Sequence, residues 1–157
     1  MFLGLGSNVG DRFKNIRMAV GLLDLHPQIA VTRVSALYET EAMDDAEGQR
    51  DFYNAVVEAE TELAPRALLV ACKEIELELG REPGGRRHAP RPIDIDLLLL
   101  GDLRVDEEDL VIPHPDLTRR RFVLVPLLQL APDLPYADAL AALGDDQRVT
   151  LVDPRRE

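Results

Sequence analysis

The chain has little of several residue types, and each shortage excludes a class of protein. It holds one cysteine and no tryptophan in 157 residues. One cysteine allows neither an internal disulfide nor a multi-cysteine metal site. No uncharged apolar run approaches the roughly 20 residues that span a bilayer. The opening residues 1–11 carry neither a basic segment nor a cleavage-like site, so we expect a cytoplasmic protein with no membrane partner.

Basic residues are outnumbered, which argues against a nucleic-acid partner. Lysine and arginine number 18 against 29 aspartates and glutamates, giving a net charge of −11. Arginines nevertheless gather in two short windows: Arg81, Arg86, Arg87, Arg91, Arg119, Arg120 and Arg121. Arginine makes forked contacts with phosphate oxygens. The windows are either solvated basic loops or the binding residues for a compact polyanionic small molecule, and we favour the second interpretation.

The pattern of apolar residues predicts one α+β domain over residues 1–157, with an uncertain tail from about residue 145. Predicted strands cover residues 2–5, 29–38, 52–61 and 93–100, and predicted helices cover residues 12–25, 65–79 and 121–130. A short strand near Val105 is expected to pair with residues 93–100. The order β-α-β-β-α-β is that of a ferredoxin-like split βαβ sandwich, in which helices cover one face of an antiparallel sheet and the other face is free to hold ligands.

Two segments of the first half have no regular pattern. The glycine-rich turn at residues 4–10 fails the dinucleotide-binding fingerprint, because Val9 stands where the third glycine belongs. It therefore predicts only tight packing between a strand and a helix. The connection at residues 39–51 is far longer than a normal hairpin loop, which favours a mobile lid.

Asp94 and Asp96 form the sharpest local feature. Side chains alternate between the faces of a strand, so both carboxylates project from one face, with Cα atoms about 6.6 Å apart. Two such oxygen ligands beside a loop of arginines suit Mg²⁺ bound together with phosphate oxygens. The alternative is a solvated edge strand with acidic outer positions. We favour the metal site, because Leu98 continues the same face and buried aspartates without a cation would be costly.

Three further features have both a functional and a structural interpretation. His114 lies between two prolines, where it either donates a hydrogen bond to phosphate or serves the structure. Phe52 and Asn54 share one strand face, where they either stack on and read a flat heterocycle or simply pack across the sheet. Cys72 lies on the apolar stripe of its helix, which indicates a core thiol rather than a nucleophile.

Several segments together resemble one known family. They are GLGSNVGDR, FYNAV, ELGR, RHAPRPIDIDLLLLGD and PHPDLTRRRFVLVPL. In the fourth segment, the loop arginine, the D-x-D pair and the apolar run follow the spacing of the 6-hydroxymethyl-7,8-dihydropterin pyrophosphokinase family. The resemblance covers nearly the whole chain. It implies a protein of ferredoxin-like fold that transfers pyrophosphate from ATP to the pterin's hydroxymethyl group in folate biosynthesis and releases AMP. Separately, we expect a monomer.

The same resemblance implies a role for each candidate residue. Asp94 and Asp96 would hold two Mg²⁺ ions, and Arg81 and Arg91 would be catalytic residues that bind and neutralise phosphates. The other implied ATP-binding residues are Arg87, Leu97, Val111, His114 and Arg120, of which Leu97 and Val111 act through main-chain groups near the adenine. The implied pterin-binding residues are Thr40, Phe52, Asn54 and Phe122. The loops after Glu39 and Arg81 would close over both substrates.

With no candidate nucleophile, we expect direct attack of the pterin hydroxyl on the β-phosphorus of ATP, driven by positioning and charge neutralisation. Two other classes stay open at this point. A two-metal phosphohydrolase using the same aspartates would hydrolyse ATP whether or not pterin is present. A non-catalytic binding module would bind ATP without forming AMP.

Overall fold

The structure of the chain is a computed structural model that describes residues 1–41, 50–82, 91–153 and 155. Within these residues the strands are β1 (Phe2–Ser7), β2 (Ile29–Val34), β3 (Tyr38–Thr40), β4 (Phe52–Thr61), β5 (Asp94–Leu99), β6 (Val105–Glu107), β7 (Leu110–Ile112) and β8 (Val149–Leu151). The helices are α1 (Arg12–Leu25), α2 (Pro65–Glu78), α3 (Arg121–Leu130) and α4 (Ala137–Leu143). The predicted mixture of helices and strands is confirmed.

The main sheet has six strands and antiparallel pairing. Its order is β5-β1-β4-β3-β8, and β2 also pairs with β4. β6 and β7 form a separate two-stranded sheet. The prediction that the strand near Val105 pairs with residues 93–100 is therefore wrong. A tight turn at residues 108–109 joins β6 directly to β7, so the local hairpin takes this pairing instead.

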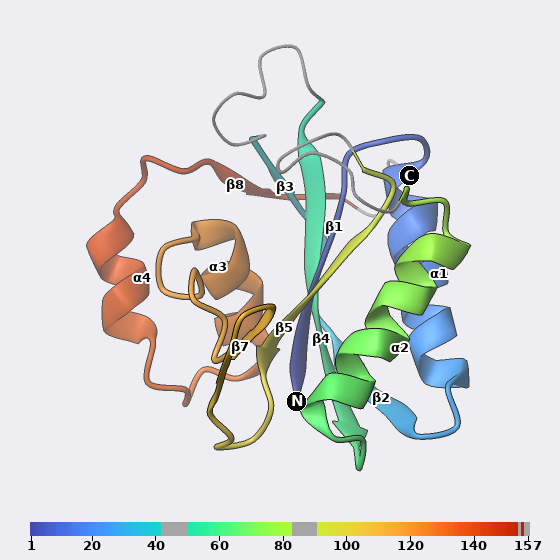
Figure 1. Cartoon of the computed structure of the whole chain (residues 1–157). Coiled ribbons are helices and arrows are strands. Elements are labelled where there is room, and N and C mark those ends of the chain that lie inside the picture. Colours follow the sequence, from blue (N-terminus) through green and yellow to red (C-terminus); the bar gives the residue numbers. More distant parts are fainter. Residues whose placement is uncertain (42–49, 83–90, 154, 156–157) are drawn as a thin grey trace.

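Helices lie on both faces of the main sheet (Figure 1). α1 and α2 pack on one face, while α3 lies on the other with α4 beside it. The expectation that helices cover one face only is wrong, because Leu124 and Leu127 of α3 pack with Val56 and Leu98 on the second face. None of the described helices is long and apolar enough to cross a membrane.

Side-chain alternation explains how the two faces differ. Leu3 and Leu5 of β1 lie in the core beneath α1 and α2, so Gly4 and Gly6 belong to the second face. The residues of β4 and β5 that join this core are Tyr53, Ala55, Val57, Ala59, Ile95 and Leu97. The predicted placement of Phe52 and Asn54 on the opposite face is confirmed. On that second face, Val56 and Leu98 lie where α3 packs.

Helix boundaries follow from local chemistry. Asp11 caps α1, because its Oδ1 accepts a hydrogen bond from the Lys14 N–H at 3.0 Å. Pro65 begins α2, where a missing N–H costs nothing. Gly80 follows the end of α2 with a φ of +98°, a left-handed conformation that favours glycine. The predicted helices at residues 12–25 and 121–130 are confirmed.

Two parts of the structure differ from the prediction. The strand expected at residues 29–38 is divided into β2 and β3 at Ser35. There the Ser35 N–H donates to Val56 O, while the Ser35 Oγ accepts from the Val56 N–H, both at 2.9 Å. The Ser35 hydroxyl thus takes the place of a backbone carbonyl as the acceptor for the Val56 N–H. α4 and β8 were not predicted, since elements of seven and three residues are too short to show a period.

We expect replacement of Leu124 by alanine to lower the free energy of unfolding by about 2–5 kcal/mol. Leu124 is fully buried in the cluster that joins α3 to the second sheet face, so the change leaves a cavity. Urea denaturation measures the loss. Leu103 is 46% exposed, and its replacement by alanine is the control, expected to cost about 0.5 kcal/mol or less. Equal losses in the two variants would contradict this description of the core.

Candidate active site

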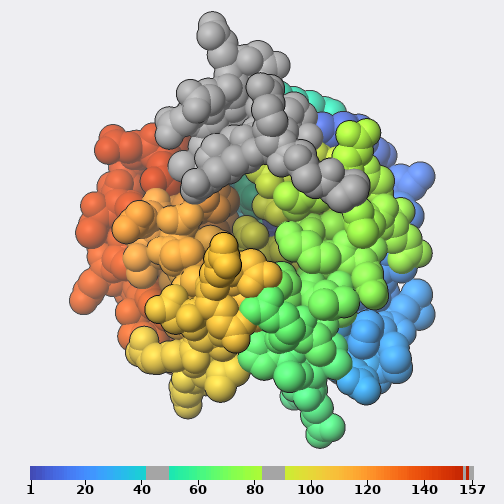
Figure 2. All heavy atoms as spheres, viewed as in Figure 1, coloured from blue at the N-terminus to red at the C-terminus, as the bar shows by residue number. Residues whose placement is uncertain are grey.

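The uncovered end of the second sheet face forms a pocket of about 370 Å³. Its walls come from β1, β3, β4 and β5, from α2 and α3, and from residues 114–116 before α3. Figure 2 shows the hollow near the centre of this view of the molecule. Segments far apart in the sequence meet here because antiparallel pairing places β5 and β4 on either side of β1.

The floor of the pocket consists of two rows of residues that run across the sheet. In one row, Gly6 of β1 pairs with Asn54 of β4 and with Asp94 of β5. In the next row, Gly4 pairs with Asp96 on one side. Directly paired residues share a face, so Gly6 lies on the same face as Asp94, and Gly4 on the same face as Asp96. A Cβ at Gly6 would lie only 3.0 Å from the Asn54 Oδ1.

The glycine-rich turn therefore does more than pack a strand against a helix, which was the prediction. Gly4 and Gly6 form the pocket floor, and Asn8 anchors the segment before β5. The Asn8 Oδ1 accepts a hydrogen bond from the Arg91 N–H at 2.9 Å, and the Asn8 N–H donates to Arg91 O at 3.2 Å. The signal was present in the sequence: glycine alternates with leucine at residues 3–6, which predicts one bare strand face.

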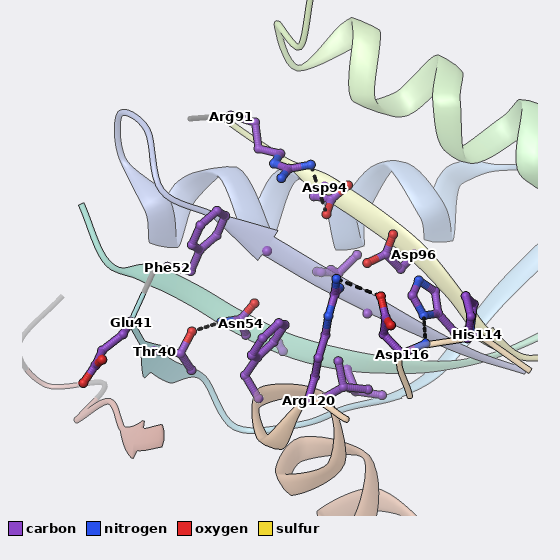
Figure 3. Close-up of a pocket in the computed structure, with 18 of the residues that line it drawn as sticks. Thr40, Glu41, Phe52, Asn54, Arg91, Asp94, Asp96, His114, Asp116 and Arg120 are labelled. Atoms are coloured by element: carbon purple, nitrogen blue, oxygen red, sulfur yellow. Dashed lines mark hydrogen bonds and ion pairs between the residues drawn. The ribbon is translucent and has the colours of Figure 1, made fainter. Parts of the chain in front are cut away.

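The acidic end of the pocket holds Asp94 and Asp96 on one face of β5, as predicted (Figure 3). Asp94 pairs with Arg81 at 2.7 Å and with Arg91 at 3.6 Å. No described residue donates a hydrogen bond to the Asp96 carboxylate. Burial, followed by the charge of Asp94, raises the pKa of Asp96 to about 7. Asp96 is therefore protonated more easily than an ordinary aspartate, although the charges of Arg120 and Arg91 oppose this shift.

Glu76 is an important residue that the sequence prediction missed. Its side chain is 2% exposed, accepts a hydrogen bond from the Ile95 N–H at 2.9 Å, and pairs with Arg81 at 2.5 Å. Burial raises the pKa of this carboxyl. Glu76 thereby fixes Arg81 and the strand between the two aspartates. It stands four residues after Cys72 on the buried stripe of α2, where a carboxylate signals a buried partner.

The segment before α3 brings His114, Asp116 and Arg120 to the pocket, and the His114 N–H donates to Leu98 O of β5 at 3.0 Å. The Arg120 guanidinium pairs with Asp116 at 3.0 Å. The His114 Nδ1 accepts a hydrogen bond from the Asp116 N–H at 3.0 Å, so the neutral ring carries its proton on Nε2. Burial, followed by the charge of Arg120, lowers the pKa of His114. His114 is therefore a neutral donor beside a cation, which suits an anionic ligand.

The other end of the pocket is aromatic and amide-lined. Phe52 and Asn54 come from β4, Thr40 from β3 and Phe122 from α3. The Asn54 Nδ2 donates to the Thr40 Oγ1 at 2.6 Å, and both side chains are buried. The Arg120 guanidinium lies 5.6 Å from the centre of the Phe122 ring. A flat ring system with hydrogen-bonding edges fits these walls.

The pocket brings together ten of the residues singled out in the sequence. They are Thr40, Phe52, Asn54, Arg81, Arg91, Asp94, Asp96, His114, Arg120 and Phe122. Leu97 and Val111 do not line it: the Leu97 side chain lies in the core beneath α1 and α2, and Val111 belongs to β7. Arg87 and most of both predicted closing loops (residues 42–49 and 83–90) lie outside the described residues. The pocket also includes Glu41, Lys73 and Asp116, which were not predicted.

The two aspartates fit a hard divalent cation that shares its ligands with a phosphate. In the described part of the chain, no group of three or more His, Cys, Asp or Glu side chains could hold a metal by itself. Mg²⁺ commonly binds through one or two carboxylates together with phosphate oxygens and water. Asp94 and Asp96 match that donor set, and a cation bound there would favour the ionised form of Asp96, whose pKa burial raises.

Comparison with curated proteins gives a consistent result. The chain is 40% identical over 148 residues to a 2-amino-4-hydroxy-6-hydroxymethyldihydropteridine pyrophosphokinase of Bacillus subtilis, covering 94% of this chain and 87% of the relative. It is 47% identical over 133 residues to the protein of that name in Methylorubrum extorquens, covering 85% and 83%. A folate synthesis bifunctional protein of Arabidopsis thaliana is 44% identical over 128 residues, which is 82% of this chain but 26% of that relative.

Solved structures show the same fold at low sequence identity. A crystal structure described as HPPK-DHPS in complex with substrates superposes with a TM-score of 0.64 at 15% identity, over 90% of this chain and 42% of that one. An HPPK-DHPS of Plasmodium falciparum gives a TM-score of 0.54 at 17% identity, over 81% and 37%. The family model of 7,8-dihydro-6-hydroxymethylpterin-pyrophosphokinase matches residues 2–132. This chain therefore belongs to the 7,8-dihydro-6-hydroxymethylpterin-pyrophosphokinase family.

Proposed function

We propose that the chain transfers pyrophosphate from ATP to the hydroxymethyl group of 6-hydroxymethyl-7,8-dihydropterin, as a step of folate synthesis. The observation that carries this proposal is one pocket with two chemically different ends. Carboxylates and arginines line one end, whereas aromatic rings and an amide line the other. A triphosphate and a flat heterocycle have the same division of chemistry.

The reaction needs no covalent intermediate. The pterin hydroxyl oxygen attacks the β-phosphorus, the bond from that phosphorus to the α–β bridging oxygen breaks, and AMP leaves with the bridging oxygen. The hydroxyl proton passes to solvent. Cys72, the only cysteine, is fully buried, and burial raises its pKa to about 12, so it does not serve as a nucleophile.

Catalysis then depends on neutralising the phosphate charge and on positioning. Arg81 and Arg91 face the triphosphate from the β5 side, and His114 and Arg120 face it from the α3 side. Asp94 and Asp96 would hold Mg²⁺, and we infer two ions, as the family resemblance implies. Such ions would offset phosphate charge and orient the triphosphate.

The remaining pocket residues would bind the pterin. Phe52 and Phe122 would stack against its ring, and Asn54, oriented by Thr40, would read its edge. The adenine contact through the main chain near Leu97 and Val111 stays a prediction from the sequence.

AMP release is the test of this function. The protein is incubated with ATP, Mg²⁺ and the reduced pterin alcohol, and each is omitted in turn. AMP that forms only with all three supports the proposal. ATP hydrolysis that ignores pterin would favour a phosphohydrolase, and ATP binding without AMP would favour a binding module.

Gly6→Ala should weaken pterin binding by about tenfold, since overpacking a tight site costs about 1–3 kcal/mol. The added methyl would lie 3.0 Å from the Asn54 Oδ1 and displace the amide that reads the pterin. Calorimetry measures the dissociation constants for pterin and for an ATP analogue. The control is Gly21→Ala in α1, where a Cβ meets nothing within 4 Å. Unchanged pterin affinity in Gly6→Ala would remove Asn54 from the binding site.

Three finer properties complete the proposal. We infer a ferredoxin-like arrangement from the chain order β1-α1-β2-β4-α2-β5 together with the sheet order β5-β1-β4-β2. A monomeric state and a cytoplasmic location stay predictions from the sequence.

A further inference from the structure

The C-terminal tail lies beyond residue 132, where the family match ends, yet it contacts both walls of the pterin end of the pocket. One wall is α3, which carries Phe122. The other wall is the pair β3 and β4, which carries Thr40, Phe52 and Asn54. Residues 147–149, called the tail link below, lie between these walls.

On the α3 side, Gln147 caps the helix from a distance of 26 residues in sequence. Its Oε1 accepts a hydrogen bond from the Arg121 N–H at 2.7 Å, and its Nε2 donates to Arg119 O at 3.0 Å. The residue at the N-cap position is Arg120, whose side chain cannot accept a hydrogen bond and makes no cap. Gln147 thus satisfies an N–H that the helix itself leaves without a partner.

On the β3 side, the tail adds a strand to the sheet edge. Val149 of β8 pairs directly with Thr40 of β3. Arg148 pairs with Asp51, just before β4, at 2.6 Å, and with Glu41, just after β3, at 3.7 Å. The Arg148 side chain is 52% exposed, so its ion pairs add less than the strand pairing does.

The tail link is short, so it limits how far the two walls of the pocket can separate. From Gln147 to Val149 an extended chain spans at most about 7 Å. One end is bonded to the residue before Phe122, and the other is paired with the residue that orients Asn54. Neither wall can therefore move far from the other while both contacts hold.

We infer that the tail link positions the two walls of the pterin site, with Gln147 as its principal residue. This inference rests on the proposed function, because it assigns the pterin to those walls. Gln147 is not among the described residues that line the pocket, so it is a positioning residue and not a catalytic one. The ATP end depends on it less, since Arg120 has its own partner in Asp116 at 3.0 Å.

The test compares the KM values of four full-length variants. Gln147→Ala removes the cap and should raise the KM for pterin about 3- to 10-fold, the range expected for losing one helix cap. The KM for ATP should change less than about twofold. Gln147→Glu keeps the acceptor for the Arg121 N–H but loses the Nε2 that donates to Arg119 O, so it should restore part of the pterin KM. Arg148→Ala should raise the pterin KM by a smaller factor.

The matched control is Arg155→Ala, an arginine of the same tail that is 89% exposed and bonds only to Asp153 among the described residues. Its KM values should equal those of the unaltered protein. Hydrogen exchange at the Arg121 amide should be faster in Gln147→Ala. This measurement reports the loss of the helix cap and does not depend on enzyme activity. Three results would overturn the inference. Gln147→Ala could leave the pterin KM unchanged, it could raise both KM values equally, or Gln147→Glu could fail to restore any of the pterin KM. An unaltered protein that releases no AMP would instead overturn the proposed function.

Discussion

Asp96→Ala should lower Mg²⁺-dependent AMP formation by at least about 100-fold while the protein stays folded. Asp96 lies in the pocket beside Asp94, and no described residue donates a hydrogen bond to its carboxylate. The fold therefore loses no bond when the carboxylate is removed. The proposed metal site, by contrast, loses one of its two protein ligands. Turnover at saturating ATP and pterin and thermal unfolding by circular dichroism measure the two effects.

A matched change separates this effect from a general loss of charge. Asp102→Ala removes an exposed aspartate six residues further along, outside the pocket, and should leave turnover within about twofold of normal. Raising the Mg²⁺ concentration should recover part of the Asp96→Ala activity, because a missing ligand weakens binding of the ion. Near-normal turnover of Asp96→Ala at low Mg²⁺ would remove Asp96 from the metal site.

Arg91→Ala should lower kcat by about 10²- to 10³-fold and change the pterin dissociation constant by less than about threefold. The Arg91 guanidinium lies at the acidic end of the pocket, 3.6 Å from Asp94. Its buried Nε has no hydrogen-bond partner among the described residues, which indicates capacity for a ligand. Its backbone is held separately by Asn8, so the variant should keep the chain path before β5.

Two companion variants sharpen this result. Arg91→Lys keeps the positive charge but loses the forked donor geometry, so its kcat should fall between those of Arg91→Ala and the unaltered protein. Arg119→Ala removes an arginine whose side chain is 79% exposed and which does not line the pocket, and it should change little. Equal loss of turnover and pterin affinity in Arg91→Ala would indicate a structural role for Arg91.

The strands that carry the site were predictable because their period is two. Alternation alone placed Asp94 with Asp96, and Phe52 with Asn54, on shared faces, and the structure confirms both pairs. The same rule applied to Gly4 and Gly6 would have predicted the pocket floor. The prediction failed there because the glycines were compared with a nucleotide-binding fingerprint and not read as a strand face.

Contacts between distant segments were beyond the sequence prediction. Glu76 is separated from Ile95 by 19 residues, and Gln147 from Arg121 by 26, and no local pattern connects either pair. The second layer formed by α3 was missed for a similar reason. Helical periodicity predicts the apolar side of α3 but does not show which face of the sheet that side packs against.

By itself, the sequence determined most of the longer elements, the faces of the strands that carry the site, and the family, because these depend on spacing within single segments. Only the tertiary structure decided that α3 packs on the second sheet face, that Glu76 holds Arg81, and that residues 147–149 join α3 to β3. Those contacts arise where segments far apart in the chain meet. Which segments meet is set by packing of the whole molecule and not by the pattern within any one segment.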